Sequence, residues 1–401
     1  MRLLLLYKQI FSSEIKLFDL KKKNFYKESE KEQRPSSLGV QGDNLALGLR
    51  KIGVEVATGD LRDKEAKENL YRAFSPDFVV GVGYWGDVPD FVDHPQKFGK
   101  TAVPWIVADG AVLNYQENLN RLKLVLTTSK FAQGVLTRDG VSSSLVKVVY
   151  EGVDTETFKS LPSSDSVAKG LRTRFAVSEN ELMLYTLGGD AASKGVPEVL
   201  ATLSIFDQKF KDWKYIVKVS LNESSRRRLK KDLAAIKNLG FEKKVFLFSE
   251  LLTEEEMVAL FNACDIYIAP SRNESFGRPL VEAASCSKPV LTVDGTATSE
   301  VVNHGVTGFA AKVEKGIYKK EFKVGEKEGL EEKVIVYDKP KLVEVRADPV
   351  DLAHYLHELT DGKLRKKMGE AARKFVLEKF DYRVSAQSLV KAIKEAYSLK
   401  D

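Results

Sequence analysis

The fold is decided by the stretch Pro270-Ser-Arg-Asn-Glu-Ser-Phe-Gly-Arg-Pro-Leu-Val-Glu-Ala283. The apolar run Ile266–Ala269 before it has the composition of a buried strand, and Pro279 suits the first turn of a helix. A strand, a polar loop and a helix in this order are typical of the carboxyl edge of a parallel sheet. Free backbone N–H groups and the helix dipole favour a diphosphate at such a junction.

Two glutamates in this stretch are candidates for binding a ligand. Glu274 lies in the loop, and Glu282 lies in the helix eight residues later. A carboxylate in the loop can accept hydrogen bonds from sugar hydroxyls, and one in the first helical turns can accept two from a ribose. The alternative is that Glu274 only caps the helix and Glu282 lies on its surface.

The alternation of short apolar runs with helical periodicity extends outward from this stretch in both directions. Runs that are apolar on both faces are typical of parallel strands covered by helices on two sides. The pattern therefore predicts an α/β protein with doubly wound parallel sheets. The expected strands are Leu3–Tyr7, Val54–Thr58, Phe78–Val82, Val103–Val107, Leu124–Thr128, Val146–Tyr150, Leu182–Thr186, Tyr215–Val219, Val245–Phe248, Ile266–Ala269 and Val290–Val293. The expected helices are Asp43–Ile52, Lys64–Phe74, Val196–Phe206, Ser224–Leu239, Glu254–Asn262 and Pro279–Cys286, with more helix from Pro349 to the end.

A chain of 401 residues is too long for one ordinary domain. Turn residues in Ser160–Ser166 predict a linker, which divides the chain into domains 1–160 and 161–380. Gly316–Val345 is rich in Lys and Glu and contains alternating apolar residues, so it is predicted to be a hairpin inserted in the second domain.

Composition excludes some classes of protein. With 43% hydrophobic and 30% charged residues the chain is globular, and a net charge of +6 does not by itself indicate a nucleic-acid partner. Cys264 and Cys286 lie in apolar or small surroundings and are expected to be buried free thiols. No apolar run is long enough for a membrane span, so a cytoplasmic protein is expected. The histidines form no metal-ligand set; they are His94, His304, His354 and His357.

Glu274-Ser-Phe-Gly-Arg-Pro-Leu-Val-Glu282 resembles the E-x7-E motif of the retaining glycosyltransferases of family 4, which have the GT-B fold. Other segments resemble the same family in the same order, along almost the whole chain. They are 41–49, 124–130, 146–158, 185–195, 299–309 and 379–383. The resemblance implies two Rossmann-like domains that face each other across a cleft. The first would bind the acceptor and the second the nucleotide-sugar donor, with a last helix, residues 381–401, crossing back to the first.

The resemblance also implies roles for individual residues. Glu274 would contact the donor sugar, Lys194 would neutralise the diphosphate leaving group, and Asp109 stands where the family often has a histidine. The donor-binding residues would be Gly42, Gly189, Lys218, Phe248, Ser249, Glu250, Leu251, Ser275, Phe276, Gly277, Arg278, Leu280 and Glu282. Neither a cofactor nor a metal is expected, because fixed charges and helix dipoles can stabilise the leaving group. A UDP- or GDP-sugar is the expected donor, and the acceptor stays open among small molecules, glycans and lipid-linked acceptors.

The chain departs from the family pattern at the expected phosphate site. The family usually has an arginine shortly before the Lys-Gly pair, but this chain has Gly188-Gly-Asp190 there. Lys218 interrupts an apolar strand near its carboxyl end, and a lysine buried without a counter-charge is costly. It is therefore predicted to replace the arginine, unless it snorkels at a sheet edge. Asp109 would orient the donor sugar or the acceptor, or would only cap a turn.

Other interpretations remain open. Gly81-Val-Gly-Tyr-Trp-Gly86 fits the G-x-G-x-x-G pattern of a nicotinamide-dependent oxidoreductase, but a poor helix with two prolines follows it. A catalytically silent GT-B binding module is a second alternative, which activity with any donor would exclude. The basic segment 16–34 could contact an anionic membrane surface peripherally, at the inner face, or could be a solvated loop beside the cleft.

Overall fold

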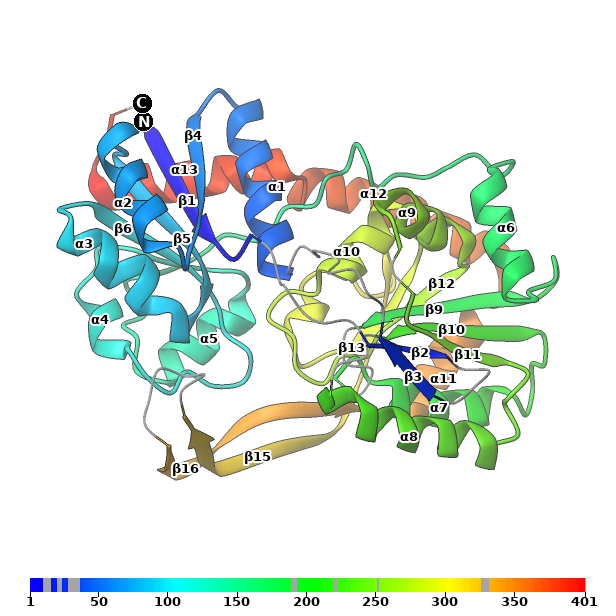
Figure 1. Ribbon diagram of the computed structural model, residues 1–401. Coiled ribbons are helices and arrows are strands. Elements are labelled where there is room, and N and C mark those ends of the chain that lie inside the picture. The colour runs from blue at the N-terminus through cyan, green and yellow to red at the C-terminus, as the bar shows by residue number, and fades with distance from the viewer. Residues whose placement is uncertain are drawn as a thin grey trace.

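The computed structural model describes residues 1–9, 16–19, 24–27, 37–188, 193–219, 223–250, 252–325 and 332–400. They form two lobes that stand side by side, each built on a six-stranded sheet (Figure 1). All neighbouring strands within these two sheets are parallel. The predicted α/β class with two doubly wound parallel sheets is confirmed.

The two sheets have the following strand orders. The first is β4 (Glu55–Asp60), β1 (Arg2–Tyr7), β5 (Phe78–Tyr84), β6 (Thr101–Val107), β7 (Val125–Thr127) and β8 (Val146–Val148). The second is β11 (Val245–Phe248), β10 (Trp213–Val219), β9 (Leu182–Gly188), β12 (Ile266–Ile268), β13 (Val290–Val293) and β14 (Gly308–Ala311). Strand β14 was not predicted.

Helices cover both faces of each sheet. In the first lobe, one face of the sheet is covered by α1 (Ser37–Lys51) and α13 (Tyr382–Tyr397). The other face is covered by α2 (Lys64–Ala73), the π-helix Pro89–Asp93, α4 (Gln116–Asn120) and α5 (Lys130–Arg138). A short α3 (His94–Lys97) follows the π-helix. In the second lobe, one face of the sheet is covered by α7 (Val196–Phe206), α8 (Glu223–Asn238) and α11 (Pro349–Glu358). The other face is covered by α6 (Ser166–Arg174), α9 (Glu254–Ala263), α10 (Arg278–Ser285) and α12 (Gly362–Lys379). Short 3-10 turns lie at Trp85–Asp87 and Ala297–Ser299. Both cysteines are buried free thiols.

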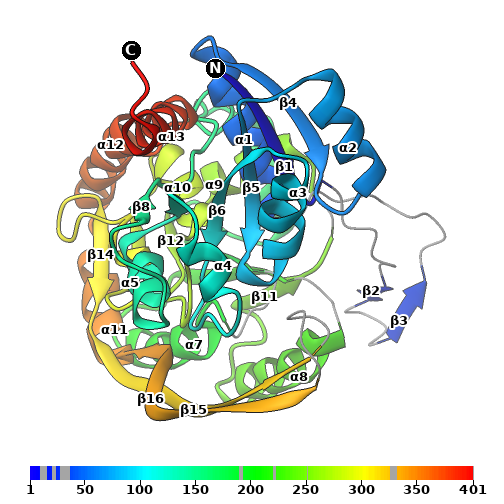
Figure 2. The same cartoon turned by 90° about the vertical axis from the view of Figure 1, so that its left-hand side faces the viewer.

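The last helix returns to the first lobe. α12 packs in the second lobe, whereas α13 lies along α1 (Figures 1 and 2). Asp381 separates the two helices; its carboxylate accepts a hydrogen bond from the Arg383 backbone N–H, and its backbone forms a bridge with Val153. Leu389 and Ile393 of α13 are fully buried in the core of the first lobe.

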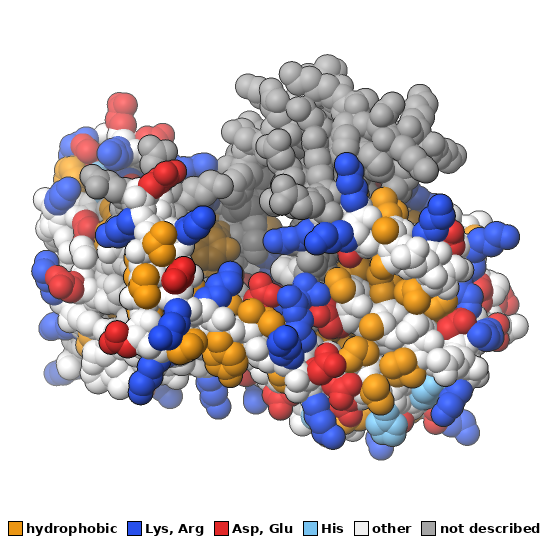
Figure 3. Space-filling view, turned by 90° about the horizontal axis from the view of Figure 1, so that it is seen from below, with side chains coloured by type: hydrophobic (Ala, Val, Ile, Leu, Met, Phe, Trp, Pro, Cys, Tyr) orange, Lys and Arg blue, Asp and Glu red, His pale blue; other side chains and the backbone are white. Residues whose placement is uncertain are grey.

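A long hairpin leaves the second lobe. Its strands are β15 (Val313–Val324) and β16 (Lys333–Ala347), which pair antiparallel, so it extends slightly beyond the predicted 316–345. The hairpin runs along the lower edge of both lobes (Figures 1 and 2). On this face, basic and acidic side chains are intermixed (Figure 3).

Within the basic segment 16–34 the structure describes a short antiparallel hairpin, β2 (Lys16–Asp19) and β3 (Asn24–Lys27), which the sequence analysis did not predict. The rest of the segment lies outside the described residues. Among the helices of the described chain, none is both long enough and apolar enough to span a bilayer.

Gly42 and Gly81, two glycines of the predicted ligand-binding patterns, lie at tightly packed positions. Helix α1 begins at Ser37 and not at Asp43, so Gly42 lies inside the helix and not in a loop before it. A Cβ atom at Gly42 would lie 2.4 Å from Cγ of the Tyr7 ring, so close helix–sheet packing already requires this glycine. A Cβ at Gly81 would lie 2.2 Å from Cβ of Phe91, so close packing of β5 against the π-helix Pro89–Asp93 already requires a glycine at this position.

Candidate active site in the cleft between the lobes

A polar pocket of about 530 Å³ lies between the lobes. It is lined by residues of the first lobe, of the second lobe and of the hairpin, and all of their side chains are polar or charged. They are Ser37, Tyr84 and Asp109; Ser193, Lys194, Arg228, Arg272, Asn273 and Glu274; and Glu344 and Arg346. All three residues predicted to be catalytic, Asp109, Lys194 and Glu274, are therefore in one pocket.

Lys194 and Glu274 form an ion pair across two neighbouring loops. Both side chains are 17% exposed. The loops are held together by a backbone hydrogen bond of 2.8 Å from Arg272 N–H to the Ser193 carbonyl. The lysine predicted for the diphosphate thus lies against the carboxylate predicted for the donor sugar.

Asp109 belongs to the first lobe but contacts the Glu274 loop. The Ser275 hydroxyl donates a hydrogen bond to Asp109 Oδ1, and the Thr128 hydroxyl donates to the Ser275 carbonyl at 3.0 Å. The Asp109 side chain reaches solvent through the pocket, although protein atoms surround it. Desolvation, and then the negative charge of Glu274, raises the pKa of Asp109 to about 6.

Glu282 is a buried residue on α10, which excludes the alternative of a surface glutamate. It is 5% exposed, and Arg278 Nε donates a hydrogen bond to its Oε1 at 2.9 Å. Burial raises the pKa of Glu282, against the lowering effect of Arg278. Arg278 also donates to the Ser37 carbonyl of the first lobe at 2.9 Å. Gly277 precedes the helix at φ 96°, a conformation that favours glycine.

Several other predicted donor-binding residues have side chains that pack in the core or form an ion pair with the protein. The side chains of Phe248, Phe276 and Leu280 pack in the core of the second lobe, so only their backbones are available to a ligand. Ser249 and Glu250 follow β11, and Glu250 forms an ion pair with Arg174.

Three donor-site predictions remain, of which Gly189 and Leu251 lie outside the described residues. Lys218 is buried, with 8% of its surface exposed. It lies between Leu187 of β9 and Phe248 of β11 near the carboxyl end of β10, as the sequence predicted.

Glu151 is a buried acidic residue of the cleft that sequence reasoning did not single out. It directly follows the segment Val146–Tyr150, and its side chain is buried. Desolvation raises its pKa to about 8; Arg278 opposes this, and Glu274 adds to it. The only signal in the sequence was a single charge at the carboxyl end of an apolar run.

Glu151 should make the stability of the protein depend on pH. Its folded pKa of about 8 lies above the ordinary 4.5, so the unfolded chain loses this proton first and the contribution of Glu151 to stability falls between these two pH values. Glu151→Gln removes that fall. We expect the variant to gain melting temperature relative to wild type as pH rises from 4.5 to 8, whereas Glu378→Gln, on the exposed face of α12, gains none. A constant difference across this range would contradict the assignment.

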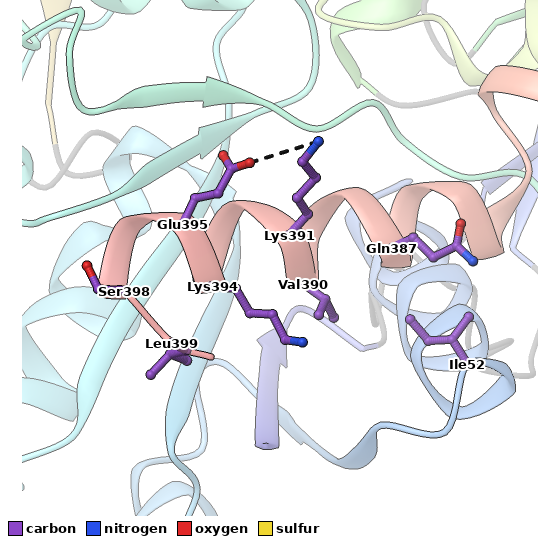
Figure 4. Close-up of a pocket in the computed structure, with 8 residues that line it drawn as sticks. All are labelled: Ile52, Gln387, Val390, Lys391, Lys394, Glu395, Ser398 and Leu399. Atoms are coloured by element: carbon purple, nitrogen blue, oxygen red, sulfur yellow. Dashed lines mark ion pairs between the residues drawn. The ribbon is translucent and has the colours of Figure 1, made fainter. Parts of the chain in front are cut away.

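A second cavity, of about 660 Å³, lies beside helix α13 and shares no lining residue with the cleft pocket (Figure 4). It is formed mainly by α13 and its C-terminal end, with Ile52 beside them. None of its residues was predicted for the site. Among the described residues, no group of three or more His, Cys, Asp or Glu side chains could hold a metal ion.

Comparison with known proteins defines the class of fold. The whole chain superimposes on the crystal structure of Anabaena Alr3699/HepE in complex with UDP and glucose, with a TM-score of 0.68, 17% identity and coverage of 98% of this chain and 100% of the other. It also superimposes on sucrose-phosphate synthase from Thermosynechococcus elongatus, with a TM-score of 0.70, 13% identity and full coverage of both chains. The protein has the GT-B fold of these glycosyltransferase structures.

The second lobe can be assigned more closely. Residues 170–318 match the family described as "Glycosyl transferases group 1". A similar curated protein is mannosylfructose-phosphate synthase of Agrobacterium fabrum, 27% identical over 177 residues. That match covers 43% of this chain and 38% of the relative. The matched region includes Lys194, Glu274 and Glu282.

Proposed function

We propose that the protein is a retaining glycosyltransferase that transfers a hexose from a nucleotide-diphosphate sugar to an acceptor, without an obligatory metal. The observation that carries this proposal is the convergence of Lys194, Glu274 and Asp109 on one polar pocket between the lobes. The proposed retention of configuration rests on the resemblance of Glu274–Glu282 to the E-x7-E motif.

The chemistry follows from the charge that develops during transfer. As the bond between the sugar and the diphosphate breaks, negative charge grows on the departing phosphate oxygens. Lys194 and the backbone N–H groups of Ser275–Gly277 are proposed to stabilise this charge. Because Lys194 pairs with Glu274, a diphosphate would compete for the lysine and leave the carboxylate to accept hydrogen bonds from sugar hydroxyls.

The nucleotide is proposed to extend from the phosphates toward Glu282, which would accept hydrogen bonds from the ribose hydroxyls. A UDP-sugar is the first donor to test, because the similar Alr3699/HepE structure contains UDP and glucose. The acceptor group that enters the pocket should be polar, since every described residue that lines the pocket is polar or charged. Peripheral membrane contact through residues 16–34 and a cytoplasmic location stay predictions.

The function can be tested with a panel of donors. Melting temperatures should rise with one of the UDP-, GDP- or ADP-sugars, and that donor should then be transferred or hydrolysed in the presence of EDTA. Activity that EDTA abolishes and manganese restores would refute the metal-free proposal. A shift in melting temperature without any turnover would favour the catalytically silent binding module. Stabilisation by a nicotinamide dinucleotide alone would favour an oxidoreductase.

Lys218 is proposed to supply the positive charge that the missing arginine would provide. The substitution Lys218→Met keeps the apolar stem and removes the charge, so folding should survive. We expect donor affinity or turnover to fall about tenfold to a hundredfold, as for the loss of a charge-assisted hydrogen bond. Donor titration and steady-state rates measure the effect. Unchanged kinetics with an altered melting temperature would mean that Lys218 has only a structural role.

A further inference from the structure

The inserted hairpin connects the two lobes directly. At its base, the Val345 N–H of β16 donates a hydrogen bond of 2.7 Å to the Arg272 carbonyl, beside the Glu274 loop. A few residues earlier, β16 reaches the first lobe. There, Lys341 Nζ lies 2.8 Å from Asp139 Oδ1, and the Leu342 carbonyl accepts a hydrogen bond from Arg138 at 3.1 Å.

Asp139 is the centre of this junction. Its side chain is fully buried, and that of Lys341 is 11% exposed. While Oδ1 contacts Lys341, Oδ2 accepts a hydrogen bond of 2.7 Å from the backbone N–H of Val112. A buried carboxylate requires its partners, so the position of Val112 and that of the hairpin are coupled through one side chain.

Arg138 makes a parallel connection. Its guanidinium donates to the Leu342 carbonyl of the hairpin and, at 2.5 Å, to the Gly110 carbonyl. Gly110 also lies against Val343 of β16. Gly110 and Val112 belong to the loop that begins with Asp109, so the loop with the candidate catalytic carboxylate is fixed to the hairpin on two sides.

We propose that the β15–β16 hairpin is a strap across the cleft, and that Lys341 and Asp139 are positioning residues that hold the Asp109 loop against the Glu274 loop. The strap emerges from the second lobe, so its contacts with Asp139 and Arg138 join that lobe directly to the Asp109 loop of the first. The role in sugar transfer rests on the function proposed above, whereas the mechanical connection does not.

The test variant is Lys341→Met. Methionine removes the Nζ that lies 3.4 Å from the centre of the Tyr337 ring but keeps most of the length of the side chain, and Asp139 retains Arg138 as a charged partner, so the fold should survive. The matched control is Lys319→Met, which changes the exposed register partner of Lys341 on β15. Asp139→Asn is a second, isosteric variant of the same junction.

Two measurements decide the proposal. Hydrogen exchange of the Val112 amide should rise at least about tenfold in Lys341→Met and stay unchanged in the Lys319→Met control. Turnover should fall about tenfold with the affinity for UDP unchanged within about twofold, because misplacement of a catalytic group affects the reacting state more than ground-state binding. In a protein that already carries Asp109→Asn, Lys341→Met should cause no further loss of turnover.

Each outcome has a clear meaning. Unchanged hydrogen exchange of the Val112 amide in Lys341→Met would overturn the proposal that the hairpin is a strap. An equal loss of turnover in the wild-type and Asp109→Asn backgrounds would show that the hairpin acts independently of Asp109 and would overturn the positioning role. If the wild-type protein transferred or hydrolysed no nucleotide sugar, the proposed function would fail, and the exchange measurement would still decide whether the strap exists.

Discussion

Lys194→Met should lower turnover by about a hundredfold to a thousandfold, the range seen when one fixed group that stabilises developing negative charge is removed. Lys194 is the cation that contacts Glu274, and it lies beside the loop whose backbone N–H groups would receive the diphosphate. Methionine has a similar length and apolar stem but cannot neutralise a phosphate. Because the side chain is partly exposed, the melting temperature should change by only a few degrees.

The measurement is a single-turnover rate with saturating donor, so that weakened binding does not enter. Lys237→Met, which removes an exposed lysine on α8, is the matched control and should leave the rate unchanged. The double variant Lys194→Met/Glu274→Gln should lose much less than the product of the two single losses, since the residues act as a unit. A rate for Lys194→Met within about threefold of wild type would exclude leaving-group stabilisation by this residue.

Glu274→Gln and Glu282→Gln should affect different kinetic parameters. The donor sugar is where charge develops, so Glu274→Gln should lower kcat about a hundredfold and change the KM for the donor little. The ribose is the same before and during reaction, so Glu282→Gln should raise the donor KM about tenfold or more with little change in kcat. Glutamine keeps the size of each side chain, which matters most for Glu282 because it is buried against Arg278.

Steady-state kinetics of both variants, with circular dichroism to confirm folding, separate these cases. If the two substitutions changed kcat and KM in the same proportions, the different roles of the loop and helix carboxylates would be wrong. A UDP dissociation constant measured by titration adds a check without turnover. It should weaken for Glu282→Gln and stay within about threefold of wild type for Glu274→Gln.

Most strands of the two sheets could be predicted from the sequence because each strand is short, apolar and bounded by turn residues. Strand β14 was missed because Gly308–Ala311 contains only one large apolar residue, and its pairing with β13 supplies the rest of its stability. The start of α1 was placed six residues late. Gly39 and Gly42 are poor helix formers, and packing of the helix against Tyr7 overrides that local preference.

The contacts between the lobes could not be predicted in this way. Asp139 and Lys341 are about two hundred residues apart, and nothing in the local pattern of either indicates the other. Glu300 is a further case. Its carboxylate accepts hydrogen bonds from the Lys130 and Phe131 backbone N–H groups at 2.9 and 2.8 Å, so a residue of the second lobe caps helix α5 of the first. Only the packing of the two lobes against each other brings these partners together.

The candidate site could be predicted from the sequence only at the residues that the family resemblance covers. Glu274, Lys194 and Asp109 come together because each follows a strand at the carboxyl edge of its sheet, which is a general property of parallel α/β folds. Glu151 and Arg272 also follow strands, but the family resemblance assigned no role to either. Arg346 enters the pocket from an insertion, and Arg272 is oriented by Glu198 of α7 through contacts of 2.8–3.0 Å.

The return of α13 to the first lobe has a consequence for exchanging parts between relatives. A chimera that joined residues 1–160 of this chain to the second lobe of a relative would bring in a foreign last helix. Leu389 and Ile393, which fill the groove beside α1, would then be replaced by side chains shaped for another surface. The first lobe is therefore built from two separate pieces of the chain, residues 1–160 together with 382–397, and a chimera should take both pieces from the same parent. Grafts that respect this division should be soluble, and those that cut only at the linker should aggregate.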